Sequence, residues 1–172
     1  MLYQIISHTP TWVFGLFAVL LALGLKQTRT GSMSLLRVAL MPVAMTSLSV
    51  YGTVSAFGAA PAVVLAWMAA AAALLVFVVR LPLPQEVRFD ATSRTLQMPG
   101  SWVPLALMMG IFFTKYFVGV VLAMQPALAS NAGFGIGFAA LYGAFSGVFS
   151  ARAVRLLRLA FGSNSLPTPV LA

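Results

Sequence analysis

The stretch PAVVLAWMAAAAALLVFVV, residues 61–79, decides the fold class, because its 19 residues include no charged side chain. A helix needs about 20 mainly apolar residues to cross the hydrocarbon core of a bilayer, which is about 30 Å thick. Inside that core the backbone polar groups must be satisfied within the protein, and a continuous helix satisfies them. The stretch therefore predicts a transmembrane helix.

The composition of the whole chain agrees with this prediction. Of its 172 residues, 61% are hydrophobic and 7% are charged, and the mean hydropathy is +1.01. A soluble globular domain carries about 25% charged residues, so that class is excluded. The chain contains no Cys, which excludes disulfides, thiolate nucleophiles, Cys-ligated metals and covalently attached haem.

Four further apolar stretches flank residues 61–79, so we expect an all-α membrane protein with a five-helix transmembrane bundle. The predicted spans are residues 10–25, 36–57, 61–79, 102–124 and 132–151, within one transmembrane domain over residues 1–161. The first span does not fit a signal peptide, because no Lys or Arg precedes it while Lys26 and Arg29 follow it directly. The polar residues 162–172 predict a disordered tail.

The basic residues predict the orientation of this bundle, because Lys and Arg in short loops mark the cytoplasmic side. With five spans, nine of the ten basic residues fall on one side: Lys26, Arg29, Arg37, Arg80, Arg88, Arg94, Arg152, Arg155 and Arg158. We therefore expect the N-terminus outside and the C-terminus inside. On this interpretation the net charge of +8 reflects topology, and no nucleic-acid partner is expected.

The polar segment 81–101 predicts a short cytoplasmic β-hairpin. Val87, Phe89, Leu96 and Met98 alternate with polar residues around a turn at residues 90–93. A lone hairpin is marginal in water, so we expect its apolar face to pack on the bilayer surface or on the helix ends.

No catalytic or metal-binding pattern emerges from the few titratable residues. Glu86 and Asp90 lie beside Arg88 and Arg94, and we expect them to neutralise local charge. His8 is the only His, and a single His does not make a metal or haem site. The phosphate-binding loop, HExxH and GxSxG patterns are missing, so we expect a non-enzymatic protein with no metal and no cofactor.

Lys115 is the tenth basic residue and lies near the middle of span 102–124, where an ionisable group is costly and usually functional. Three outcomes are open: a neutral amine, a side chain that extends toward an interface, or an ammonium that meets an external anion. For the last outcome, the candidate substrate-binding residues are Lys115, Thr114, Tyr116, Tyr142 and Ser146.

The fifth span carries small residues at four-residue spacing, which allow helices to approach closely. The candidate helix-packing residues are Gly133, Gly137, Gly143 and Gly147. They predict packing within the bundle, or alternatively a homodimer or a membrane-protein partner bound through the fifth helix.

The segment from Val87 to Leu105, with its Pro99-Gly100-Ser101-Trp102 turn, resembles an uncharacterised family of small bacterial inner-membrane proteins, distantly CcdC-like. The resemblance implies a multi-pass protein of the bacterial inner (cytoplasmic) membrane and no established activity. Three functions stay open. They are a non-enzymatic accessory, assembly or sensory module, a small transporter that uses Lys115, and, with least support, an enzyme that acts on lipid or quinone through His8 or Lys115.

Overall fold

A computed structural model describes residues 10–82, 87–90 and 95–163 of the chain, and it is mostly helical. The helices are α2 (Thr11–Lys26), α3 (Leu35–Phe57), α4 (Pro61–Val79), α5 (Val103–Met124) and α6 (Ala132–Ser163), with a 3-10 helix η1 (Pro126–Ser130). Three short strands complete the fold: β1 (Gly31–Ser34), β2 (Arg88–Asp90) and β3 (Thr95–Met98). The five predicted helices are thus confirmed as helices.

Four of these helices, α3 to α6, are long and apolar enough to cross a membrane. The α2 helix has 16 residues, which gives a length of about 24 Å and leaves it short of a full hydrocarbon core. The sequence and the structure therefore agree on a membrane protein built from an apolar helical bundle.

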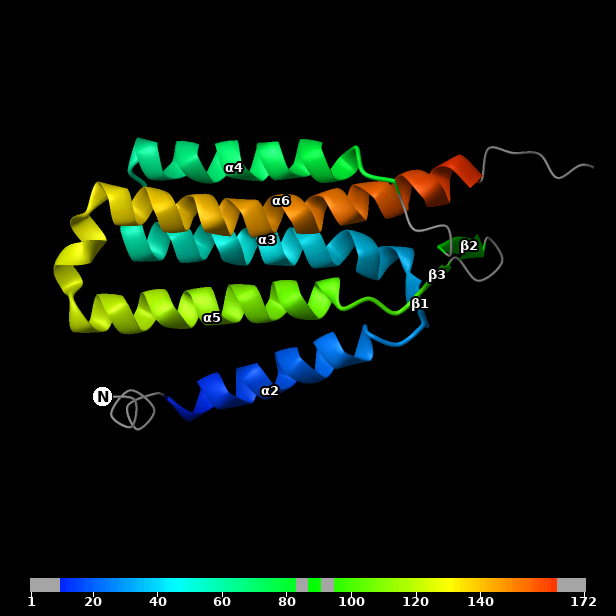
Figure 1. Ribbon diagram of the computed structural model, residues 1–172, viewed down its shortest axis with the longest axis horizontal. Helices are drawn as coiled ribbons and strands as arrows, with labels where there is room; N and C mark the ends of the chain where they lie inside the picture. The colour runs from blue at the N-terminus through cyan, green and yellow to red at the C-terminus, as the bar shows by residue number, and fades with distance from the viewer. Residues whose placement is uncertain (1–9, 83–86, 91–94, 164–172) are drawn as a thin grey trace, which may run out of the picture.

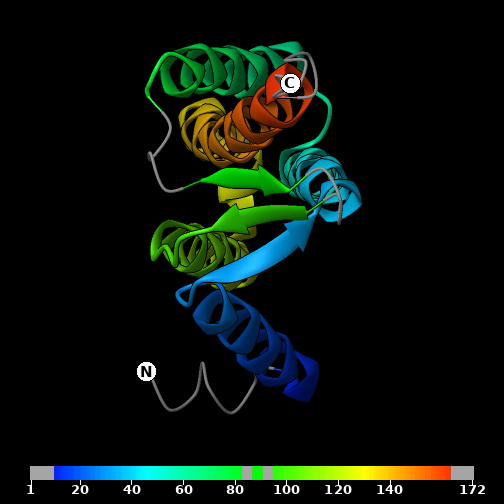
Figure 2. The same cartoon turned by 90° about the vertical axis from the view of Figure 1, so that its right-hand side faces the viewer.

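The helices lie roughly alongside one another, and α6 lies between α4 and α3 (Figure 1). The α2 helix lies at the edge of the bundle, beside α5. It is nearest to α5 at its C-terminal end and diverges from α5 toward its own start (Figure 1). The three strands lie across one end of the bundle (Figure 2).

Most of the basic residues lie at the end of the bundle where the strands are found. This end is called here the basic end. The α2 helix ends there at Lys26, α3 begins there and carries Arg37 in its first turn, and Arg80 follows α4. The last three turns of α6 carry Arg152, Arg155 and Arg158. At the opposite end, the turn at residues 58–60 and η1 contain no Lys or Arg. Gly58 makes that turn possible because its φ of 73° is unfavourable for other residues.

The predicted hairpin forms the antiparallel pair β2 and β3, in which Phe89 lies opposite Leu96. A third strand, β1, was not predicted; it pairs antiparallel with β3 and gives the sheet order β1-β3-β2. Its sequence, GSMS, contains a single large apolar residue, Met33. Met33 pairs with Leu96 across the edge of β3 that faces away from β2. Four residues with one large apolar side chain do not show the alternation that predicts a strand.

The sheet packs on the helix ends, which is one of the two placements expected for it. Leu96 is fully buried and contacts a cluster with Val38 of α3 and with Ala153 and Leu156 of α6. The sheet therefore holds α3 and α6 together at the basic end of the bundle.

The α6 helix is longer than the predicted span 132–151, because its 32 residues extend to Ser163. Its length is about 48 Å at 1.5 Å per residue, more than a hydrocarbon core requires. The added turns are amphipathic: Leu156 and Ala160 are buried, while the Arg155 guanidinium donates a hydrogen bond to the Pro82 carbonyl. Of the predicted tail, residues 164–172 lie outside the described residues, as do His8, Glu86 and Arg94.

At the interface between α4 and α6, glycine residues of α6 allow the two helix backbones to approach closely. A Cβ atom added at Gly143 would collide with the Trp67 carbonyl, and one added at Gly147 would collide with the Ala71 carbonyl. Gly135 and Ala139 are also buried and continue this stripe toward the start of α6.

The other two glycines expected to pack lie elsewhere on α6. Gly133 and Gly137 are exposed, and a Cβ atom at Gly137 would meet nothing within 4 Å. The packed stripe therefore runs through Gly135, Ala139, Gly143 and Gly147, because α4 contacts that side of α6. A pattern of small residues fixes the spacing of such a stripe but does not show which of two neighbouring stripes meets the next helix.

Candidate functional site

A cavity of about 910 Å³ lies between α2, α3 and α5, with side chains of α6 also lining it. Its walls are mostly apolar and aromatic, and Lys115 is the one charged side chain among the lining residues. Cavities of roughly 300–1,000 Å³ with apolar walls and a few polar groups are typical binding sites for small molecules. This cavity is therefore the candidate site.

The cavity exists because α2 and α5 cross closely at one end and diverge at the other (Figure 1). At the close end, Gly24 is buried against Leu105, and a Cβ atom at Gly24 would collide with that leucine side chain. Farther along, Phe17 contacts the rings of Phe112 and Phe113 at centroid distances of 5.3 and 6.1 Å. From Leu20 toward the start of α2, the two helices move apart and the cavity lies between them.

Lys115 lies twelve residues after Val103, about 18 Å along α5, and its side chain points toward α3 and α6. Its Nζ atom lies 5.0 Å from the centroid of the Tyr142 ring, which is a cation–π contact. On α3 it faces Gly52, where an added Cβ atom would collide with Nζ. A glycine at position 52 is therefore required for the Lys115 side chain to occupy this place.

The amine of Lys115 has no carboxylate within the helices to neutralise it, since the sequences of α2 to α6 contain no Asp or Glu. The chain's two acidic residues, Glu86 and Asp90, belong to the segment between α4 and β3. A cation–π contact supplies about 0.5–2 kcal/mol and leaves the charge uncompensated. The site can therefore attract an anionic group from outside the chain.

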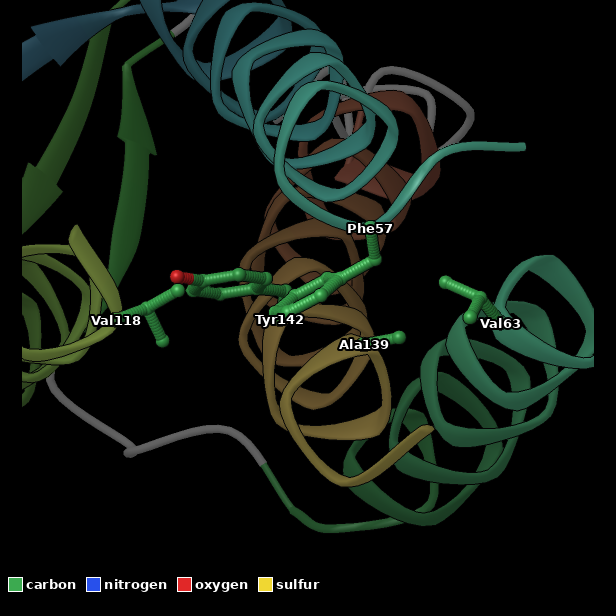
Figure 3. Packing of buried hydrophobic residues seen from close by; sticks show 5 residues of the cluster. All are labelled: Phe57, Val63, Val118, Ala139 and Tyr142. Carbon is green, nitrogen blue, oxygen red and sulfur yellow. The ribbon is translucent and has the colours of Figure 1, made fainter. Parts of the chain in front are cut away.

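Tyr142 forms the part of the site that belongs to the bundle core. Its side chain extends from α6 toward α5, with its hydroxyl beside Val118, and Phe57 of α3 lies on its other side (Figure 3). Only 3% of Tyr142 is exposed, so its ring is held in one place under Lys115.

A small hydrogen-bonded network fixes the wall behind Tyr142. The Ser49 hydroxyl of α3 donates to the Tyr142 carbonyl over 3.1 Å and accepts from the Trp67 indole N–H of α4 over 3.0 Å. The Thr53 hydroxyl donates to the Ser49 carbonyl over 2.9 Å. Three helices are thus joined through one buried serine, which makes this wall rigid.

The structure brings three of the five predicted substrate-binding residues to the cavity: Lys115, Tyr116 and Tyr142. The other two, Thr114 and Ser146, are not among the lining residues. Their hydroxyls donate to carbonyls of their own helices, Thr114 to Gly110 over 2.7 Å and Ser146 to Tyr142 over 3.0 Å.

Sequence reasoning missed the contribution of α3 to the cavity. Ser49, Gly52 and Ser55 all line it, and they follow one another at three-residue spacing on one side of the helix. This stripe of small and polar residues inside an apolar span was a usable signal. The partner that gives it meaning, Lys115, is more than 50 residues away in the chain.

The cavity lies toward the end of the bundle away from the basic end, and along α5 it extends about 24 Å, from Met108 to Met124. Its lining begins at Met45 on α3 and at Met108 on α5, and it does not continue past Leu20 on α2. It reaches the opposite end of the bundle at Trp12 and Met124. The described residues therefore form a recess closed toward the basic end, not a passage through the bundle.

Metal-ligating side chains do not contribute to this site. In the described part of the chain, no three residues of His, Cys, Asp or Glu gather in one place. The chemistry available in the cavity is that of one amine, several hydroxyl groups and aromatic rings.

The chain belongs to the family of unknown function DUF6622, whose family model matches residues 1–166. The search of curated proteins gave no match, and the search of solved structures gave none.

Proposed function

We propose that the protein is a non-enzymatic accessory, assembly or sensory module of the bacterial inner membrane. It crosses the membrane several times, with its N-terminus outside and its basic end in the cytoplasm. The gathering of Lys and Arg at one end of the bundle supports this orientation, because basic loops stay on the cytoplasmic side.

The observation that carries the proposal is a recess that is open at one end of the bundle and has Lys115 on its wall. This recess reaches the end of the bundle away from the basic residues, so a ligand can enter it from that end. A recess of this shape suits the binding of a ligand, whose presence is then transmitted to a partner through the surface of the bundle.

That surface includes an exposed side of α6 with Gly133, Ile136, Gly137 and Leu141. A photo-crosslinking residue at Ile136 should capture a membrane partner or a second copy of the chain in living cells. The proposal is wrong if Ile136 gives no crosslink and the purified protein is strictly monomeric.

The orientation is tested separately by single cysteines, because the natural chain has none. A membrane-impermeant thiol reagent added to intact cells should label a cysteine in the turn at residues 58–60 and should not label one at Ser32 in β1. The reverse pattern would contradict the proposed orientation.

The second candidate function is a small transporter for an anionic or polar substrate, with two chains forming the pathway. The position of Lys115 on the cavity wall favours it. In that case Lys115→Met should abolish a measured flux, and an unchanged flux would eliminate this candidate.

A further inference from the structure

We propose that the cavity binds a lipophilic monocarboxylate, meaning a long single-chain acid whose carboxylate pairs with the Lys115 ammonium while its chain lies along the apolar walls. This inference deepens the proposed function, since it names the class of ligand that the module would sense.

The charge of the site requires an anion with one negative charge. Among the described residues, Lys115 is the one charged side chain that lines the cavity, and the helices contain no acidic residue that could balance it. A buried ammonium is costly when it stands alone, and an ion pair with a single carboxylate has no net charge. A ligand with two or more charges would leave an excess that the cavity does not neutralise.

The walls select a weak acid over a permanently charged anion. Aromatic side chains line the cavity beside Lys115 and toward its open end, among them Trp12, Tyr51 and Tyr116. A carboxylic acid has an ordinary pKa near 4 and can pass such walls in its neutral, protonated form. A phosphodiester lacks a neutral form near physiological pH, so a phospholipid headgroup does not reach Lys115 by this route.

The length of the recess between Lys115 and its open end fits an extended chain of about ten methylene groups. Nine residues separate Lys115 from Met124, the last residue of α5, so the apolar wall beyond the amine is about 13 Å long. Trp12 lies at the far end of this wall, near the start of α2. An acid bound at Lys115 therefore places the end of a chain of about ten methylene groups close to Trp12.

The test uses the purified full chain in nanodiscs of zwitterionic lipid and follows tryptophan fluorescence. The probe is 11-bromoundecanoic acid, because its terminal bromine quenches an indole that it contacts. The comparison probe is 11-bromo-1-undecanol, which has the same chain and bromine and lacks the carboxylate. We expect saturable quenching by the acid, with a dissociation constant at least tenfold lower than that of the alcohol.

Four variants assign this difference to the cavity. Lys115→Gln should reduce the preference for the acid to less than twofold, while Lys115→Arg should retain most of it. Gly52→Ala keeps the amine and displaces it, because the added Cβ atom collides with Nζ, so the preference should fall several-fold. Trp12→Phe should remove most of the saturable quenching. Thermal unfolding of each variant shows whether the fold is retained.

The proposal fails if the acid and the alcohol bind equally, or if Lys115→Gln retains the preference. It also fails if the preference disappears when phosphatidylglycerol replaces half of the zwitterionic lipid, since a phospholipid would then be the preferred occupant. In each case the crosslinking test at Ile136 still decides the proposed function independently.

Discussion

The two sides of this bundle use glycine in different ways. On one side, α6 presents Gly135, Ala139, Gly143 and Gly147 to α4, and at Gly143 and Gly147 the two helix backbones are in direct contact. On the other side, α2 has one such position, Gly24, which lies against Leu105, and its contact farther along α5 is made by the large ring of Phe17. Repeated small residues hold two helices together along their length, whereas a single one allows them to diverge.

The different packing of the two sides explains why the cavity lies between α2 and α5 and not between α4 and α6. The α4–α6 side is closed by backbone contact and by the Ser49 network, and it acts as the scaffold. The α2–α5 side encloses the cavity and Lys115. Mutations on the first side should mainly change stability, and mutations on the second side should mainly change binding.

The largest expected effect comes from closing the space at Gly143. Gly143→Leu inserts a side chain where even a Cβ atom collides with the Trp67 backbone, so α4 and α6 must separate. We expect a loss of about 3 kcal/mol or more, at the upper end of overpacking penalties. Thermal unfolding in detergent measures it.

The matched control is Gly137→Leu on the same helix, where the first added atom meets open space. It should change the unfolding free energy by less than about 0.5 kcal/mol, as is usual for surface positions. Equal destabilisation by the two substitutions would contradict the assignment of the packed stripe.

A smaller effect is expected from Ser49→Ala, which removes a donor to the Tyr142 carbonyl and the acceptor for the Trp67 indole N–H. Hydrogen bonds between helices in membranes contribute about 0.6 kcal/mol on average, so the loss of both should cost about 1 kcal/mol. Chemical unfolding in a mild detergent checks the value. A cost near zero would show that the network does not join the three helices.

A still smaller effect is expected at the crossing of α2 and α5. In Gly24→Ala the new methyl group collides mainly with the flexible end of Leu105, so the strain can be relieved by a change of rotamer. We expect a loss below about 1 kcal/mol. The same variant should alter the affinity for 11-bromoundecanoic acid more than Gly143→Ala does, and the opposite ranking would contradict the division of roles.

The smallest effect on stability should come from Lys115→Met. The amine makes one cation–π contact, worth about 0.5–2 kcal/mol, and its removal also removes the cost of a half-buried charge. The net change in unfolding free energy should therefore lie within about 0.5 kcal/mol. A large destabilisation would assign Lys115 a structural role in place of a binding role.

The helices could be predicted from the sequence because apolar length is a local property. The predicted span 61–79 coincides with α4, and the spans 36–57 and 102–124 differ from α3 and α5 by one residue at their starts. The end of α6 was missed because its last turns are amphipathic and pack on the sheet, so they do not read as a span.

Contacts between distant segments could not be predicted in the same way. Lys115 was identified from its depth in a span, but Gly52 acquires its role only when α3 and α5 face each other. The strand β1 likewise depends on pairing with β3, which lies more than 60 residues later in the sequence. A pattern within one helix does not show which neighbour it meets.

The most direct test of the central claim compares Gly119→Cys with Gly137→Cys in the natural cysteine-free background. Each glycine lies five residues from the helix end that is away from the basic residues, and an added Cβ atom meets nothing within 4 Å at either one. Only Gly119 lines the cavity. A methanethiosulfonate that carries a carboxylic acid should therefore react at least tenfold faster with the Gly119→Cys thiol in nanodiscs, and undecanoic acid should suppress that reaction. Equal reaction rates, unaffected by the acid, would contradict the claim that Lys115 lies in an accessible, anion-binding cavity.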